Sequence, residues 1–428
     1  MHLLGSSLII LLVVGAPIGI ALSGATILVV LSDPIMTPKA LFRSFFSFLS
    51  SYTLMAIPFF IYAGFLMERT GLIAKLFKFA DSLIGWLPGG FAYATLLAAV
   101  MFGAISGSST AMAAAMGVIA YPEMIRRGYP VWMAAGIIAC GGGIALLIPP
   151  SITLILFGII TEESIVALFF AGVVPGIMLA LSDAVIIVAI SFYMRLPAGT
   201  FSVRNVFSTL WEAWPALLMP VIILGGLYGG LFTPTEAGAA ACAYAMVYGL
   251  LSGGVRFLRD LMPTTKRAAN LTAIVFFVLG CVGVFQFLLA NKGWPQDVAN
   301  WVNDQGLSQI GFLVLLLVVM LFLSMFLTGV AILVLTVPIF FPVALTLGVD
   351  PVHLGILTAL AIEMGGVIPP VGLNLFAVSG TTGVSVTKVM QGAIPFLFTD
   401  GLVLILVLLF PILALWLPLN AVKSAFGS

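Results

Sequence analysis

The sequence predicts an all-α, polytopic membrane protein that contains an internal repeat. Of its 428 residues, 62% are hydrophobic and only 7% are charged, and the mean hydropathy is +1.27. A soluble domain carries about 25% charged residues, so lipid must solvate these apolar side chains. Roughly a dozen apolar stretches approach the ~20 residues that a bilayer-crossing helix needs. The third observation is a pattern of glycine and proline that occurs twice.

Other protein classes are excluded by composition and motifs. The apolar runs are continuous and do not alternate with a period of two, which excludes a membrane β-barrel. A net charge of +1 without a basic patch gives no reason to expect a nucleic-acid partner. Cys140, Cys242 and Cys281 lie inside apolar runs without metal-site spacing, so we expect inert thiols. The two histidines, His2 and His353, complete no catalytic set, and we do not expect an enzyme.

The repeat is seen as glycines and prolines that recur 220 residues apart. Chance matches between apolar stretches would give scattered Leu and Val identities, whereas glycine and proline mark backbone geometry. The sequence therefore predicts an internal duplication. The matched pairs are Pro122 and Pro342, Gly128 and Gly348, Pro149 and Pro369, Pro150 and Pro370, Gly172 and Gly392, and Pro175 and Pro395.

The N-terminal segment predicts two spans and one amphipathic helix. The first span covers about residues 3–31 and lacks a basic leader, so we expect it to be retained rather than cleaved as a signal peptide. The second covers about 46–67. In residues 72–83, apolar side chains at helical spacing alternate with lysines, and this pattern favours a helix that lies in the membrane interface.

Each repeat contains two interruptions. The apolar stretch 91–120 is broken at residues 103–110, and the second repeat shows the same break at 323–329. Each flank is short for a full crossing, so the stretch is either a hairpin that enters the membrane and returns or a broken helix. The helices predicted at 131–147 and 353–367 then stop at the paired prolines.

Two uninterrupted spans, at about 213–231 and 237–251, separate the repeats, and a final span covers about 401–417. The segments that flank this central pair of spans are basic, which predicts that both flanks lie on the cytoplasmic side of the membrane. Because the chain shows no nucleotide-binding loop, we do not expect it to use ATP. The flanking basic residues are Arg195, Arg204, Arg256, Arg259, Lys266 and Arg267.

Interrupted helices in matching positions of two halves indicate a transporter binding site. A broken helix exposes carbonyl oxygens that can coordinate a cation and amide groups that can face an anion. Small-residue helix packing and simple proline kinks are the structural alternatives. The hydroxyl and amide groups that we predict to contact substrate are those of Ser108, Ser109, Thr110, Ser151, Thr153, Thr328 and Asn374.

The paired prolines remove amide donors, so carbonyls near 143–148 and 365–368 are expected to lose their partners. With hairpin hydroxyls, these neutral oxygens suit a sodium ion in each repeat, whereas a proton-driven carrier would more often carry carboxylates or histidines in its spans. Glu363 is either a structural buried acid or a coupling residue. Glu236 is expected to cap a helix. Asp183 and Asp400 lie in spans without an evident partner.

At these residues the sequence resembles the large membrane subunit of tripartite ATP-independent periplasmic (TRAP) transporters, of the DctM-like type. The resemblance covers nearly the whole chain, in order. The stretches that carry it are AIPFFIYAG (56–64), SGSS (106–109), IPPSI (148–152), LFFAGVVPG (168–176), GLFTPTEA (230–237), DPVHLG (350–355) and PPVGLNL (369–375).

The resemblance implies an inverted-repeat helical bundle in the bacterial inner membrane, with two re-entrant hairpins. An elevator-type transport domain would move against a scaffold domain. Sodium (Na+) would drive import of a small organic anion. A four-helix, DctQ-like membrane subunit and a periplasmic binding protein would be its partners. The sodium ligands carried over are Ser106, Ala145, Ile148 and Pro150 for the first site, and Ser324, Gly365, Ile368 and Val371 for the second.

We therefore predict six segments. They are residues 1–90 (scaffold spans and interfacial helix), 91–195 (first transport half), 196–268 (central scaffold spans), 269–310 (scaffold span and arm), 311–400 (second transport half) and 401–428 (C-terminal span). An alternative is a sodium/dicarboxylate symporter of similar inverted-repeat fold that works without a binding protein.

Overall fold

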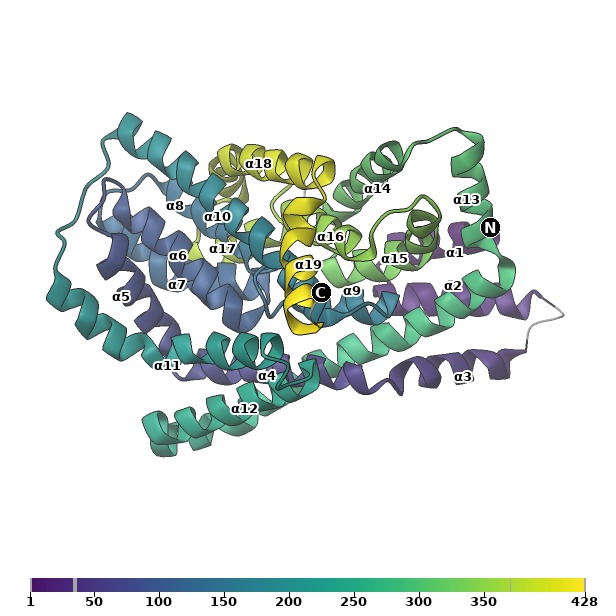
Figure 1. The fold of residues 1–428 in the computed structure, drawn as a ribbon, viewed down its shortest axis with the longest axis horizontal. Coiled ribbons are helices and arrows are strands. Elements are labelled where there is room, and N and C mark those ends of the chain that lie inside the picture. Colours follow the sequence, from purple (N-terminus) through teal and green to yellow (C-terminus); the bar gives the residue numbers. More distant parts are fainter. Residues whose placement is uncertain (1, 34–36, 370, 427–428) are drawn as a thin grey trace.

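The computed structural model describes residues 2–33, 37–369 and 371–426, with the side chains of residues 2, 105, 106 and 421–426 outside the described part. Helices account for most of these residues, and the described ranges contain no strand (Figure 1). The helices are α1 (His2–Val13), α2 (Ile18–Leu31), α3 (Pro38–Leu49), η1 (Tyr52–Met55), α4 (Ala56–Arg69), α5 (Leu72–Ile84), α6 (Gly90–Ser106), α7 (Ser109–Arg126), α8 (Val131–Ile144), α9 (Ile152–Thr161), α10 (Ile165–Met194), α11 (Val203–Tyr228), α12 (Pro234–Lys292), α13 (Trp294–Asp304), α14 (Gln309–Ser324), α15 (Gly329–Thr346), α16 (Pro351–Gly365), α17 (Leu373–Thr382), α18 (Val386–Leu409) and α19 (Ile412–Phe426).

The repeat is confirmed, and it extends well beyond the matched glycines and prolines. The bounds of α7 and α15 differ by 220 residues at both ends, and the other pairs agree within a few residues. The repeat therefore includes the helices before each hairpin as well as the hairpins themselves. The paired elements are α3 and α4 with the second part of α12, α5 with α13, α6 with α14, α7 with α15, α8 with α16, α9 with α17, and α10 with α18.

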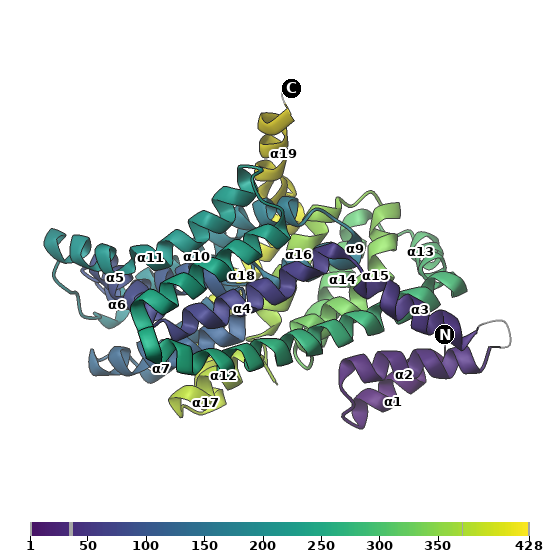
Figure 2. The same cartoon turned by 90° about the horizontal axis from the view of Figure 1, so that it is seen from below.

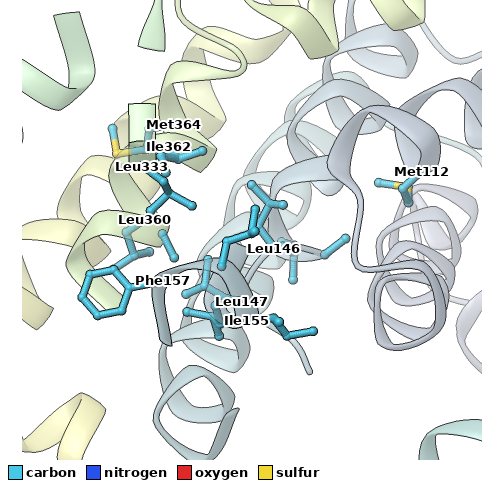
Figure 3. Close-up of a cluster of buried hydrophobic side chains, with 14 of the residues drawn as sticks. Met112, Leu146, Leu147, Ile155, Phe157, Leu333, Leu360, Ile362 and Met364 are labelled. Atoms are coloured by element: carbon cyan, nitrogen blue, oxygen red, sulfur yellow. The ribbon is translucent and has the colours of Figure 1, made fainter. Parts of the chain in front are cut away.

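The two repeats interlock, because the helix after each proline break packs on the hairpin of the other repeat. Helix α9 packs against α15 and α16, and α17 packs against α7 and α8 (Figure 1). Figure 3 shows Phe157 of α9 beside Leu360 of α16. A β-carbon at Gly355 would lie 2.9 Å from Phe157 Cε1, so the missing side chain makes room for this ring. The shared apolar core joins both halves into one body.

The long helix α12 packs along the N-terminal helices and also contacts the second hairpin. It packs along α2, α3 and α4 and also contacts α15 (Figure 2). Close approach is possible because glycines face the neighbouring helix: a β-carbon at Gly283 would lie 2.8 Å from Ser44 O of α3. The same helix thus touches both the N-terminal elements and one hairpin.

Two predicted N-terminal spans are wrong in detail. The span predicted at 3–31 is a helical hairpin, α1 and α2, because Gly15 takes a left-handed conformation (φ 88°) and Pro17 precedes α2. The span predicted at 46–67 is a pair of helices bent by 59° at residues 50–51. Its break falls at Ser50 and Ser51, and the backbone of Ser51 is extended (φ −68°, ψ 127°).

Three further predictions need correction. The predicted helix at 72–83 is confirmed as α5, but its apolar face packs on α6 and α11 rather than lying free for lipid. The span predicted at 237–251 continues as α12 through a kink at Gly254 (φ 51°, ψ −131°), so the basic flank is part of that helix. The final predicted span is split at 410–411, where Pro411 follows α18, and α19 projects away from the body (Figure 2).

Within the described ranges, five helices are long and apolar enough to cross a membrane, or up to six when the bent pair of α3 and α4 counts as one span. The four hairpin helices, α6, α7, α14 and α15, have only 16 to 18 residues each. Short paired helices of this kind fit a segment that enters the membrane and returns.

Helices α8 and α18 cross with their backbones in contact at Gly136 and Gly392. A β-carbon at Gly392 would overlap the carbonyl group of Trp132. We expect Gly392→Ala to lower the free energy of unfolding by about 1–3 kcal/mol, because two backbones must separate. Thermal unfolding followed by tryptophan fluorescence measures this. Gly380→Ala, at a helical glycine with open space around it, is the matched control and should leave the melting temperature unchanged or slightly raised. Equal melting temperatures for both variants would contradict the close crossing.

Candidate functional site

The hairpin tips and the starts of the helices after the proline breaks enclose a cavity of about 740 Å³. Both tips line it, with residues 107–110 from the first repeat and 327–330 from the second. The opposite wall is apolar and comes from α2, α4 and α12. The predicted site residues that line this cavity are Ser108, Ser109, Thr110, Thr153, Ser324, Thr328 and Asn374.

Four helix N-termini meet at this cavity. The first residues of α7, α9, α15 and α17 all line it or adjoin residues that do. Three of these helices begin with a hydroxyl cap: Ser108 Oγ accepts a hydrogen bond from the amide of Ala111 (3.4 Å), and Thr328 Oγ1 accepts one from Ala331 (3.3 Å). Ser151 caps α9 in the same way. Each cap satisfies one amide and leaves others at the helix end.

Two predicted substrate contacts lie deeper than expected. Ser151 is fully buried and does not line the cavity, because its hydroxyl accepts a hydrogen bond from the amide of Leu154 (3.3 Å). Asn374 is 1% exposed and reaches the cavity edge, and its Nδ2 donates to the carbonyl of Ala139 in α8 (3.3 Å). Its Oδ1 has no partner among the described residues. Asn374 therefore links α17 of one repeat to α8 of the other.

The turn between α8 and α9 carries the carbonyls predicted to bind the first sodium ion. No described residue donates a hydrogen bond to the carbonyl oxygens of Ala145, Ile148 or Pro150. The hairpin tip closes on this turn, since a β-carbon at Gly107 would lie 2.6 Å from Pro150 O. The side chain of Ser106, the fourth predicted ligand, lies outside the described part of the structure. These three oxygens are available to a ligand behind the cavity wall.

The second predicted sodium site has the same construction. Ser324, at the end of α14, occupies the space that a side chain at Gly365 would take. Its Oγ donates to Leu321 O (2.7 Å), which leaves oxygen lone pairs free. The carbonyls of Ile368 and Val371 accept no hydrogen bond from the described residues. Pro370, between them, lies outside the described residues.

The expectation that all carbonyls before the prolines lose their partners is wrong for the earlier ones. The carbonyls of Gly143 and Ile144 accept hydrogen bonds from the amides of Leu146 and Leu147 (2.9 and 3.1 Å), and Gly365 O accepts one from Ile368 N (3.3 Å). A tightened turn at the helix end supplies these donors. In the first repeat the unpaired carbonyls begin at Ala145, directly after Ile144, and in the second they include Ile368, three residues after Gly365.

Glu236 is confirmed as a cap, since its Oε2 accepts hydrogen bonds from the amide (2.8 Å) and hydroxyl (2.9 Å) of Thr233. All three cysteines are free, and Cys140 and Cys281 are buried as expected.

The side chain of Glu363 is buried beside the backbone of Gly143. It is 2% exposed, and a side chain at position 143 would overlap the Glu363 carboxyl group.

A second cavity, which the sequence did not indicate, lies at the other end of α9. It has a volume of about 810 Å³, and Arg43 of α3, Gln286 of α12 and the loop carboxylates Glu162 and Glu163 line it. Burial, and then the nearby Asp350, raise the pKa of Glu163 above its ordinary value. The two adjacent acids, Glu162 and Glu163, follow an apolar run and could have been noticed in the sequence. No sequence pattern near Arg43 indicated that it would line the same cavity.

Comparison with known proteins gives the family. The family description "Tripartite ATP-independent periplasmic transporter, DctM component" matches residues 6–413. The chain is 39% identical over 401 residues to the C4-dicarboxylate TRAP transporter large permease protein DctM of Pseudomonas aeruginosa, with 93% of each chain covered. It is 35% identical over 373 residues to the sialic acid TRAP transporter large permease protein SiaM of Vibrio cholerae, with 86% of this chain and 87% of that one covered.

Among solved structures, the fold is similar to that of the Alcanivorax borkumensis YdaH transporter. The TM-score is 0.62, with 14% sequence identity and coverage of 96% of this chain and 97% of the other. This likeness concerns the fold alone. The matched length, the repeated hairpins and the apolar helices together show that the chain belongs to the DctM component family of TRAP transporters, as a multi-pass inner-membrane permease.

Proposed function

We propose that this permease imports a small organic anion together with sodium ions. The observation that carries the proposal is the convergence of four helix N-termini and unpaired turn carbonyls around one cavity. The cavity is lined by no lysine or arginine among the described residues, so a bound anion must be stabilised by dipoles and by co-bound cations. Both relatives named above carry, by their names, acids of this class.

The anion would lie at the ends of α7, α9, α15 and α17. Each helix N-terminus carries a positive partial charge of about half an elementary charge, and its free amides donate hydrogen bonds to oxygen anions. Hydroxyls from Ser109, Thr110 and Thr153 provide further donors at the same surface. The apolar wall opposite would contact the carbon skeleton.

Sodium would bind behind this surface, at the two turns. Ala145, Ile148 and Pro150 supply carbonyl oxygens in the first, and Ser324 adds a hydroxyl in the second. Neutral oxygens suit a hard monovalent cation. Because cation and anion would lie close together away from bulk water, each would favour binding of the other, and this attraction would couple their movement.

An elevator-like movement fits the two walls of the cavity. The polar wall comes from the hairpin tips and the starts of α9 and α17, which interlock as one body, while the other wall belongs to α2, α4 and α12. That second wall is apolar, with Ile18, Ile61 and Leu271 among its residues. Sliding along an apolar wall breaks few hydrogen bonds, so the hairpins and the helices after the proline breaks can move as a unit against it. We expect a small membrane subunit and a periplasmic binding protein to complete the system, which the family description calls tripartite and periplasmic.

Uptake into proteoliposomes tests the proposal. They would contain this chain and its small membrane partner, with the cognate binding protein and a labelled dicarboxylate or sialic acid outside. We expect uptake that needs both an inward sodium gradient and the binding protein. Equal uptake with and without sodium would contradict the sodium sites, and uptake without the binding protein would favour the independent symporter.

Ser324→Ala tests the second sodium site. Loss of one oxygen ligand to a cation should raise the sodium concentration for half-maximal uptake by about tenfold or more, because a hydrogen bond or contact to a charged group contributes roughly 1.5–3 kcal/mol. Ser182→Ala is the matched control, since Ser182 Oγ donates to Leu179 O (2.8 Å) in the same way but lies on α10, away from the cavity. A sodium dependence that equals the control's would remove Ser324 from the site.

Gly107→Ala tests the closure of the first hairpin on the proline turn. Gly107 (φ 59°) faces Pro150 O, so an added methyl group would push the tip from the carbonyls. We expect uptake to fall at least tenfold with little loss of folded protein. Gly128→Ala shares the left-handed backbone (φ 83°) but has open space, and therefore controls for strain alone. Equal uptake by both variants would show that the tip tolerates displacement.

A further inference from the structure

Asp183 of α10 and Asp400 of α18 meet in the interior of the protein. They are 1% and 2% exposed, and their carboxyl groups lie within hydrogen-bonding reach of each other. Helices α10 and α18 are counterparts in the two repeats and pack against each other (Figure 1). The pair therefore lies at a junction between repeats, away from the residues that line the hairpin cavity.

No positive charge balances this pair within the described structure. The titratable groups that face it from neighbouring helices are Glu363 of α16 and Cys140 of α8. Glu363 adds negative charge, and the Cys140 thiol donates instead to Ala393 O (3.8 Å). No amide, hydroxyl or amine of the described residues reaches Asp183 Oδ1 or Asp400 Oδ2.

A hydrogen bond between two carboxyl groups requires a proton, because ionised carboxylates are acceptors only. Two buried like charges without a cation would also be strongly unfavourable inside a membrane protein. A metal ion is the other means of joining carboxylates. No three or more described acid, histidine or cysteine residues are arranged to hold one. The ligand that this geometry fits is a proton.

We propose that Asp183 and Asp400 form a proton-binding site that holds one proton between α10 and α18 and joins the two repeats through it. Loss of the proton leaves two facing carboxylates, which repel each other and loosen this junction. The site is separate from the hairpin cavity, and the inference does not need sodium-driven import to be correct.

Infrared spectroscopy of the purified full-length protein tests for the proton directly. At neutral pH the wild type should show the C=O stretching band of a protonated carboxylic acid. Asp183→Asn combined with Asp400→Asn should lose one such group, while an amide-to-carbonyl bond keeps the helices joined. Asp304→Asn, at an exposed acid on α13, is the control and should leave the band unchanged.

The pH dependence of the melting temperature gives a second readout. At neutral pH an unfolded aspartate is ionised, so the folded state binds one more proton than the unfolded state. Folding stability should therefore fall as the pH rises, by about tenfold in the equilibrium constant per pH unit while the proton stays bound. The double variant should lack this component of the pH dependence.

Wild-type protein alone can overturn the proposal. Absence of any protonated carboxyl band at neutral pH would show that the pair is ionised, with a bound cation in place of the proton. A band of equal size in the double variant would assign the proton to another acid and reject the site equally. Neither measurement uses uptake, so failure of this proposal is distinct from failure of the proposed transport function.

Discussion

The structure depends on one constraint: helices that end inside a membrane must have their backbone polar groups satisfied by protein. Each unpaired amide or carbonyl in hydrocarbon costs several kcal/mol, so a broken helix is tolerated only around a protein-lined space. Here the breaks face each other. Hydroxyls of Ser108, Ser151 and Thr328 satisfy the first amides of three helices, and the glycine tip at Gly107 closes on the turn at Pro150. The carbonyls that remain unpaired are those that a ligand would use.

Because the repeats interlock, the backbone polar groups at the broken helices of each repeat are covered by the other repeat. If each repeat packed only on itself, each set of broken ends would face lipid on one side. Instead α9 covers the second hairpin and α17 covers the first, and Asn374 donates across the boundary to the carbonyl of Ala139. Neither half can form its polar surface alone. This mutual cover also makes the polar wall of the cavity one rigid unit, which an elevator-like movement would require.

The breaks at Gly107 and at the paired prolines could be predicted because glycine and proline limit the backbone wherever they occur, and a repeat at a fixed separation excludes coincidence. The bends near Gly15 and Ser50 were missed, since apolar composition continues through both and periodicity alone does not reveal a turn. The polar residues lining the cavity follow from the hairpin tips and from the helix starts after the proline breaks. The apolar wall from α2 and α12 could not be predicted, because a helix that faces an apolar cavity wall has the same composition as a helix that faces lipid. The contact between Asp183 and Asp400 joins residues more than 200 positions apart, for which a single sequence holds no local signal.

The distribution of charged side chains is consistent with a site built from backbone polar groups. The cavity contains no charged side chain among its described lining residues, whereas carboxyl groups lie buried behind it at Glu363 and at the pair of aspartates. A fixed cation in the cavity would hold an anion tightly in every state and slow its release. Helix ends are weaker and act over a short range, so under the proposed coupling their effect would be greatest with a sodium ion in the adjacent turn. A site built from backbone dipoles would therefore make anion affinity conditional on the cation, and this conditional affinity is what a coupled carrier requires.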